Sequence, residues 1–249
     1  MKSAIMFLFT IVIGLSIFTV SKADINDNLV LALSFDTGNT IVDLSGQKNK
    51  ITINGNPKWV DGHFGKALYF DGKSAVIAPY IPLKDKSFTV QLWVNPDMVG
   101  EQEIVFSQHD SSAANLSLHL RIYNTGIVRF GFYSNDLDSP ANTIKKGEWH
   151  NLTFIFNSSE KLRKIYVDGN KVASDISVSA YLGAKGETKI GAWERPDKPE
   201  FYQSFNGIID EVRVWLRPLK DEEILEGMNT KMAVEPVNKL VTTWANIKK

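Results

Sequence analysis

The sequence predicts an all-β fold, an antiparallel sandwich of two sheets with one short helix near the C-terminal end. Short segments of alternating apolar and polar residues recur along the chain. Turn signals separate them, among them Asp168-Gly169, a pair typical of tight hairpins. No long helical segment lies between them, as a parallel sheet with crossover helices would require. Many strands at short spacing therefore favour a sandwich.

The expected strands share a period-2 alternation of side chains. They lie at residues 28–35, 66–70, 87–95, 103–108, 115–123, 126–133, 149–157, 164–169, 187–193 and 207–215. A helix is predicted over residues 221–229, whose first turn carries acidic residues that the helix dipole favours.

The N-terminal stretch is typical of a secretory signal peptide. Lys2 is a short basic region, residues 4–20 are mostly apolar, and Ser21-Lys22-Ala23 has the small residues of a cleavage site. We expect cleavage after Ala23 and a secreted or extracytoplasmic protein, with association with the cell surface left open. The alternative is an uncleaved membrane anchor, because the run nearly reaches spanning length.

Composition excludes several classes of function. Without Lys2 and Lys22, 26 basic residues remain against 28 acidic ones, so the net charge of −2 predicts no nucleic-acid partner and, after signal cleavage, no membrane span is expected. The chain contains no cysteine, which excludes disulfides, cysteine nucleophiles and Cys-ligated zinc. The four histidines have no metal-binding spacing. His150 is expected to be a hydrogen-bonded core residue, and His63 and His109 are expected in loops.

The predicted central strands have one apolar face and one polar, aromatic face. Leu118 and Leu120, for example, alternate with His119 and Arg121. A polar and aromatic sheet face is the mixture expected where a ligand binds. The candidate ligand-binding residues are Gln91, Trp93, Arg121, Tyr123, Arg129 and Tyr133, with Asn135, Asp136, Trp193 and Tyr202 at the rim. The alternative is that these side chains pack on one another without a ligand.

An ordered series of segments resembles a known family. "LALSFDTG", "WVDGHFGKALYFDG", "FTVQLWVNP", "KIYVDGNKV" and "FNGIIDEVRVWLRPLKDEEI" resemble the LamG-like jelly-roll branch of the concanavalin A-like lectin/glucanase superfamily, from about residue 29 to 228. The resemblance implies a jelly roll with one concave and one convex sheet, spanning residues 24–229. It also implies a non-catalytic module that binds an extracellular glycan or polysaccharide. Residues 230–249 lie beyond the resemblance and receive no role.

Two other functions are kept as alternatives. The first is a protein-binding adhesion or matrix module, whose aromatic face would meet a cell-surface protein. The second is a glycan-cleaving enzyme, which needs two carboxylates facing each other across the sugar. Endoglucanases of the superfamily carry a Glu-x-Asp-x-x-Glu strand motif that this chain lacks, and the expected concave strands carry no acidic pair.

Asp210 conflicts with the alternation of the strand at 207–215. It shares the predicted apolar phase with Val212 and Val214, whereas Arg213 falls on the opposite phase. A buried carboxylate needs a partner, which a cationic side chain, backbone N–H donors or a bound cation could supply. All three remain open from the residues alone.

The resemblance implies a calcium ion for this carboxylate. In the superfamily the matching aspartate holds a structural calcium, so Asp210, Asp36 and the carbonyl of Gly65 are the expected ligands. Calcium prefers several oxygen ligands of this kind. Asp43 and Asn49 are weaker candidates, and a carboxylate held by hydrogen bonds alone is the alternative.

Overall fold

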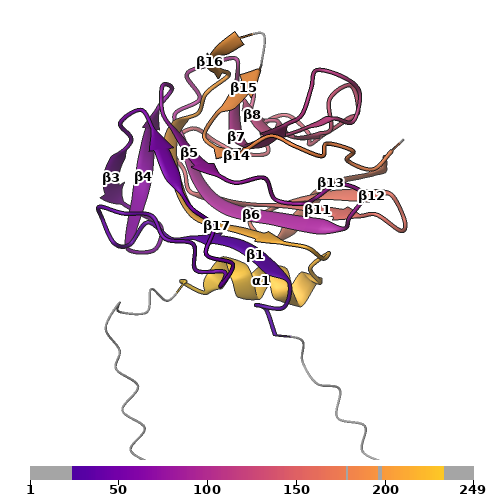
Figure 1. Cartoon of the computed structure of the whole chain (residues 1–249), viewed down its shortest axis with the longest axis horizontal. Helices are drawn as coiled ribbons and strands as arrows, with labels where there is room; N and C mark the ends of the chain where they lie inside the picture. Colours follow the sequence, from indigo (N-terminus) through magenta and orange to yellow (C-terminus); the bar gives the residue numbers. More distant parts are fainter. Residues whose placement is uncertain (1–23, 178, 196–197, 233–249) are drawn as a thin grey trace, which may run out of the picture.

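The computed structural model describes residues 24–177, 179–195 and 198–232, and it is a sandwich of two antiparallel sheets (Figure 1). The expected signal peptide lies outside the described residues. The fold therefore confirms the predicted all-β jelly-roll class. Within the described part of the chain, no helix is both long and apolar enough to cross a membrane.

The first sheet, called sheet A, has the order β13-β12-β11-β6-β17-β4-β3, and β1 also pairs with β17. Its long central strands β6 and β17 are neighbours in space although more than a hundred residues separate them in the sequence. Its strands are β1 (Leu29–Leu33), β3 (Lys58–Asp61), β4 (Lys66–Asp71), β6 (Phe88–Pro96), β11 (His150–Asn157), β12 (Leu162–Val167), β13 (Asn170–Ile176) and β17 (Asn206–Trp215).

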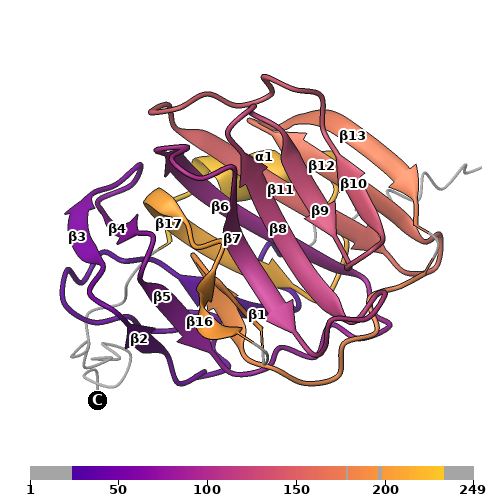
Figure 2. The ribbon, with the colours of Figure 1, turned by 90° about the horizontal axis from the view of Figure 1, so that it is seen from above.

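The second sheet, called sheet B, has the order β10-β9-β8-β7-β14-β5-β2. Its strands are β2 (Thr52–Asn54), β5 (Ala75–Ala78), β7 (Gln102–His109), β8 (Ser117–Tyr123), β9 (Val128–Gly131), β10 (Asp136–Asp138) and β14 (Thr188–Ile190). A small ribbon of β15 (Trp193–Arg195) and β16 (Lys198–Tyr202) lies on the outer side of sheet B, next to β7 (Figure 2).

The main core lies between the two sheets and is rich in phenylalanine. The rings of Phe88, Phe130, Phe132, Phe154 and Phe156 are fully buried and meet at edge-to-face or tilted angles. Such pairs add to the free energy of burying aromatic surface. Both sheets therefore turn their apolar phases inward, as the alternation predicts.

One arginine is enclosed in this core. Arg163 is 1% exposed, forms a bidentate pair with Asp175, and donates to the backbone carbonyls of Phe130 and Asn135. Its guanidinium also lies over the ring of Phe132. A buried charge is tolerated when it is paired and hydrogen-bonded in this way.

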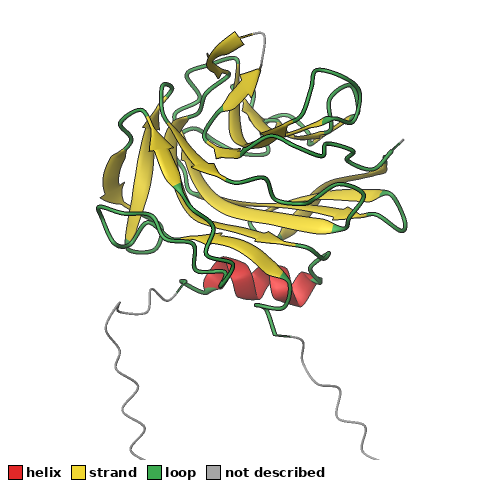
Figure 3. Ribbon diagram, in the orientation of Figure 1, coloured by secondary structure: helices red, strands yellow, loops and turns green. Residues whose placement is uncertain are grey.

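The outer face of sheet A is covered by the helix α1 (Asp221–Asn229), which has the predicted bounds (Figure 3). Its first turn is acidic, and Glu223 accepts a hydrogen bond from the backbone N–H of Lys220 (2.8 Å). Ile224 of α1 joins a second apolar cluster on this face, outside the main core. The other buried members are Leu29, Ala32, Ile155, Tyr166, Trp215, Leu219 and Met232.

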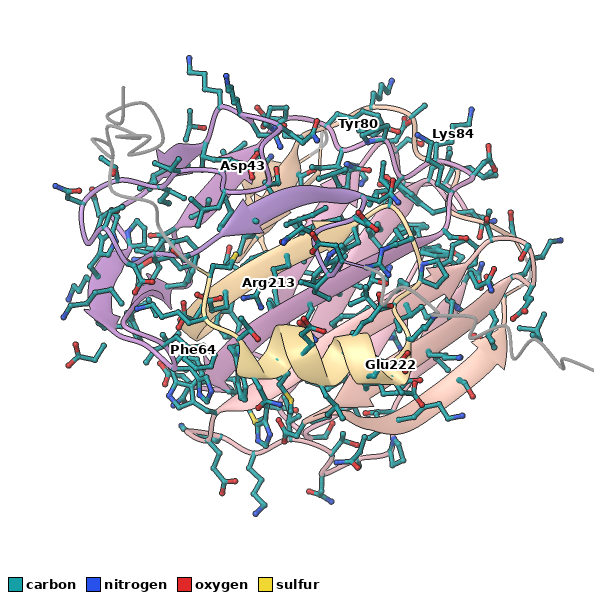
Figure 4. All side chains as sticks on the ribbon, turned by 90° about the horizontal axis from the view of Figure 1, so that it is seen from below. Asp43, Phe64, Tyr80, Lys84, Arg213 and Glu222 are labelled. Carbon is teal, nitrogen blue, oxygen red and sulfur yellow. The ribbon has the colours of Figure 1, made fainter. Side chains whose placement is uncertain are left out.

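A β-bulge in β17 changes the face on which its side chains lie. Its pairing with β6 shifts register between Asp210 and Arg213, and Glu211 has a φ of +52°. Ile209, Val212 and Val214 face the core, whereas Asp210 pairs with the outward-facing Trp93. The prediction that Asp210 shares a face with Val212 is wrong, because the extra residue interrupts the alternation. Arg213 is correspondingly on the α1 side of the sheet, where it donates to the Gly227 carbonyl (Figure 4).

Candidate functional site

The outer face of sheet B carries a cluster of charged and aromatic side chains. Arg121 and Tyr123 come from β8, Arg129 from β9, and Asp136 and Asp138 from β10. The antiparallel register sets Arg121 opposite Arg129, and Arg129 opposite Asp138. Opposite residues in a sheet are close neighbours, so the strand pairing itself assembles the cluster.

Arg129 is the centre of this cluster. Its Nε and Nη2 donate to the two carboxylate oxygens of Asp138 (2.7 Å each), and Nη1 lies 3.0 Å from Asp136 Oδ2. Its guanidinium also lies over the ring of Tyr123, at 5.0 Å from the centroid. The hydrogen bonds that Arg129 donates to Asp138 raise the pKa of Arg129, so this group stays charged. The Arg129 side chain is 24% exposed, which leaves part of it open to a ligand.

Arg121 is held more tightly, beneath the surface. It is 7% exposed and donates from Nη1 to Gln102 Oε1 and from Nε to His119 Nδ1 (3.1 Å). Its guanidinium lies 4.8 Å from the ring centroid of Trp193, which is itself 2% exposed. Arg121 is thus packed against Trp193 of β15 and is little exposed.

His119 lies between these charges. Burial lowers its pKa well below the usual range, and the nearby Arg121 and Arg129 guanidinium groups lower it further. Its Nε2 lies 3.4 Å from Asp136 Oδ1, and burial raises the pKa of that carboxyl. A side chain at Gly131, the residue opposite His119, would overlap the imidazole and the Asp136 carboxylate. Glycine is therefore required there.

Tyr133 completes the exposed part of the face. It is partly buried, has a φ of +63°, and its ring lies 6.3 Å from that of Trp193. We call the partly exposed residues of this surface the sheet-B face. They are Tyr123, Arg129, Tyr133, Asp136 and Asp138.

Two of the predicted ligand-binding residues lie elsewhere. Gln91 and Trp93 are on β6, in sheet A, and α1 covers them. Gln91 donates to the carbonyl of Ile224 (3.1 Å), and Trp93 donates to that of Met228 (3.2 Å). Their placement beside Arg121 on one concave sheet is wrong. The alternation in the sequence shows that their side chains point away from the core, but it does not show which element covers them.

The expected rim residues divide in a similar way. Asp136 lies on the sheet-B face, whereas Asn135 is 8% exposed and donates to Asn115 and Ser177. Trp193 is buried, as described above. The side chain of Tyr202 lies outside the described residues.

An acidic pair lies on this sheet, outside the expected concave strands at 87–95, 115–123 and 126–133, which carry none. Asp136 and Asp138 both face outward from β10, a short strand that the sequence analysis did not identify. They lie on the same strand and contact the same arginine. This arrangement differs from two carboxylates that face each other across a sugar.

The other histidines are packed into the fold. His150 is hydrogen-bonded and buried as predicted, between Asp168 (2.9 Å) and the backbone N–H of Lys145 (3.1 Å). His63 lies between β3 and β4 as predicted, and its ring stacks on Trp93 at 3.5 Å between centroids. His109 is the last residue of β7 rather than part of a loop.

The expected calcium ligands converge on the outer face of sheet A. Asp210 is fully buried and accepts hydrogen bonds from the backbone N–H groups of Phe64 (3.0 Å) and Glu211 (2.9 Å). Asp36 accepts from the backbone N–H of Lys66 (3.0 Å), next to Gly65. Burial raises the pKa of Asp210 to about 7, and the Glu211 and Asp36 carboxylates also raise it. The Asp36 and Asp210 carboxylates are thus near enough to influence each other electrostatically.

This site has oxygen atoms without hydrogen-bond partners but few side chains that could bind a metal ion. Among the described residues, Asp36 Oδ2 and Glu211 Oε1 are buried oxygens with no hydrogen-bond partner. No group of three or more His, Asp or Glu side chains in the described ranges is arranged to hold a metal ion. Such an ion would need backbone carbonyls too, and the Gly65 carbonyl accepts a hydrogen bond from Gly62 (2.9 Å). The donor set of carboxylate and carbonyl oxygens fits calcium chemically.

The weaker metal candidates form a closed turn. Asp43 accepts hydrogen bonds from the backbone N–H groups of Ala32, Ser45 and Asn49, and from the side chains of Ser45 and Asn49. Both of its oxygens are occupied. Asp43 and Asn49 therefore connect this loop to β1, and the prediction that they hold the metal has no geometric support.

Solved structures with the same fold are binding domains. Domain 4 of AbnA, an extracellular arabinanase from Geobacillus stearothermophilus solved with arabinotriose, has a TM-score of 0.63 and 22% identity, covering 80% of this chain and 98% of that one. The binding domain of botulinum neurotoxin DC, solved with SialylT and with rat synaptotagmin II, has TM-scores of 0.60 and 0.61 at 17% identity. Each match covers 81% of this chain and 51% of the neurotoxin domain.

The sequence comparisons agree with this fold. A non-toxic nonhemagglutinin of Paraclostridium bifermentans is 24% identical over 155 residues, which is 57% of this chain. The chain matches only 13% of the length of that relative. Residues 70–225, more than half of the chain, match the family described as the concanavalin A-like lectin/glucanases superfamily. Together with the two-sheet jelly roll, this match shows that the chain belongs to the concanavalin A-like lectin/glucanases superfamily.

Proposed function

We propose that the protein is a secreted, non-catalytic module that binds an extracellular glycan through the sheet-B face. The observation that carries this proposal is the Tyr123–Arg129 stack flanked by Asp136 and Asp138, which is partly exposed and held in place by strand pairing. Sugars present apolar ring faces and many hydroxyl groups. Tyr123 and Tyr133 offer aromatic surface, and the charged groups offer hydrogen-bond donors and acceptors.

The charges favour a neutral, hydroxyl-rich glycan over an acidic one. Arg129 is paired with two carboxylates, and Arg121 is 7% exposed. An acidic sugar would have to compete with Asp136 and Asp138 for Arg129 and would be repelled by both. Sugar hydroxyls, in contrast, can donate to these carboxylates without displacing the arginine.

The same pairing supports a binding role rather than hydrolysis. A glycosidase needs one carboxyl group as an acid and a second as a base or nucleophile, on opposite sides of the scissile bond. Both carboxylates here lie on one side and are engaged by Arg129. The arabinotriose complex of Domain 4 of AbnA supports a carbohydrate ligand for a domain of this shape. The synaptotagmin complex of the neurotoxin domain makes a protein the alternative partner.

We also propose a structural calcium ion bound by Asp36, Asp210 and the Gly65 carbonyl. When bound, the ion would neutralise carboxylates that lie together in a buried region. Asp36 follows β1 and Asp210 lies in β17, so the site would connect the first and last strands of the domain. The unpartnered Asp36 Oδ2 supports this proposal.

A glycan array tests the binding proposal. The protein should retain neutral oligosaccharides more strongly than sialylated or uronic-acid oligosaccharides of similar length. A positive glycan should then lose affinity when Arg129 is replaced. Binding to no glycan, together with retention of a cell-surface protein, would move the function to the protein-binding alternative.

A further inference from the structure

The three residues after α1 return to the carboxylate cluster on the outer face of sheet A. The carbonyl of Thr230 accepts from Arg213, and the backbone N–H of Met232 donates to Glu211 Oε2 (2.9 Å). Between them, Lys231 Nζ lies 3.2 Å from Asp36 Oδ1. The segment thus provides an ammonium group for the carboxylate that we propose as a calcium ligand.

The cluster contains two cations that differ in how firmly they are held. Arg213 is 5% exposed and donates to Glu211, to the Gly227 carbonyl and to Thr230. The Lys231 side chain is 48% exposed, and its ion pair is with Asp36. Arg213 is held in place by α1 and the bulge. The Lys231 ammonium, in contrast, can move from Asp36 into solvent with only a small loss of free energy.

Lys231 also lies beside the two residues, Asp36 and Gly65, that would hold the proposed calcium. Gly65 has a φ of +63°, and a Cβ there would overlap Asp36 Oδ1 and lie 2.7 Å from Lys231 Nζ. The ammonium therefore lies beside both Asp36 and the Gly65 backbone. A calcium ion bound to the same carboxylate and the same residue would be repelled by an ammonium at this distance.

We propose that Lys231 is a tethered cation that competes with calcium for Asp36. In the absence of metal its ammonium compensates part of the negative charge of Asp36, Asp210 and Glu211. When calcium binds, Lys231 leaves Asp36, and the segment after α1 loses one of its contacts with sheet A. This inference rests on the proposed calcium site and adds a competitor from the chain itself.

The test compares wild type, Lys231→Gln and Lys66→Gln. Lys66 is the matched control, because its side chain pairs with Asp61 (2.7 Å) while only its backbone contacts Asp36. Calcium chloride is titrated by calorimetry into chelator-treated protein. We expect Lys231→Gln to bind calcium about fivefold more tightly than wild type, the scale of a partly exposed ion pair, and Lys66→Gln to stay within about twofold.

Melting curves of the same proteins in chelator and in calcium give the second readout. Lys231→Gln should melt below wild type in chelator, and calcium should raise its melting temperature more than that of wild type. Equal calcium affinities and equal shifts for wild type and Lys231→Gln would overturn the competition while leaving the calcium site intact. No calcium binding by either protein would overturn both proposals. If Lys231→Gln melts below wild type by the same amount in calcium as in chelator, the lysine has a purely structural role, and the competition is overturned.

Discussion

The outer faces of the two sheets carry similar side chains but have different neighbours. On sheet A, Gln91 and Trp93 alternate with core residues and end beneath α1, where they hydrogen-bond to its backbone. On sheet B, Tyr123 and Arg129 alternate in the same way and remain partly exposed. The difference teaches that alternation in the sequence identifies the side chains that point away from the core. Whether such a residue stabilises the fold or meets a ligand depends on what covers it.

The largest expected effect is on the covered face. Trp93→Ala should lower the free energy of unfolding by about 3 kcal/mol, because it removes a large buried ring, its stacking on His63 and its hydrogen bond to Met228. Glycan affinity of the folded protein should not change. Urea unfolding and calorimetry measure the two quantities. A Trp93→Ala protein of normal stability with lost glycan binding would reverse the assignment of the two faces.

Tyr133→Ala is the matched change on the open face. Tyr133 is only partly buried, so its replacement should cost less than about 1 kcal/mol of stability while weakening glycan binding. Unfolding and glycan-binding measurements on the two variants thus distinguish the face that stabilises the fold from the face that binds the glycan.

Much of this architecture was predictable, since ten strands and α1 follow from periodicity and from the acidic first turn of the helix. Two of the missed strands, β2 and β10, escaped prediction because their residues lack a continuous buried face. Thr52–Asn54 is fully exposed in β2, and only Leu137 is buried in β10. Such edge strands form because a neighbouring strand offers backbone partners, and sequence alternation does not report this.

The candidate sites were predicted less completely, for two physical reasons. The bulge at Glu211 shifts the phase of β17, and the sequence does not signal the positive φ at this position, because the residue there is not glycine. The position of α1 over β6 is a tertiary contact, so Gln91 could not be distinguished from Arg121 by pattern. A signal did exist for Asp136 and Asp138: the spacing i, i+2 in "NDLDS" places both carboxylates on one side of a strand.

Calcium removal should have the second largest effect, again on sheet A. With free calcium about a hundredfold above its dissociation constant, binding stabilises the folded state by about 2.7 kcal/mol. Chelator should therefore lower the melting temperature by about 5–10 °C for a domain of this size. Asp210→Asn should melt low in both conditions and respond little. A wild-type melting curve that chelator leaves unmoved would mean that backbone N–H groups alone hold Asp210.

Replacing Arg129 tests the open face. Arg129→Ala removes the guanidinium that stacks on Tyr123 and positions Asp136 and Asp138, so glycan affinity should fall about tenfold. Stability should change by less than about 1 kcal/mol, because the pairs are partly exposed. Lys171→Ala, a change of an exposed side chain in β13 of sheet A, should alter neither quantity. Equal glycan affinities of the Arg129 and Lys171 variants would contradict the proposed site.

The smallest effect is a pH dependence that arises beneath the sheet-B face. His119 faces Arg121, Arg129, Arg163 and Asp136, and burial with the three arginines lowers its pKa from the usual 6.5. The unfolded chain therefore takes up the proton at a higher pH than the folded chain. The stability that His119 contributes is complete above pH 6.5 and is lost as the pH falls toward the lowered value. In the folded protein, protonation of His119 would prevent Nδ1 from accepting the hydrogen bond of Arg121, so glycan affinity should decline only as the pH approaches the lowered pKa. Unfolding and glycan-binding measurements from pH 8 to pH 5 in His119→Gln, which cannot titrate there, should show a flatter profile than wild type. If stability and glycan affinity depend on pH in the same way in wild type and in His119→Gln, then His119 does not control the arrangement of the sheet-B face.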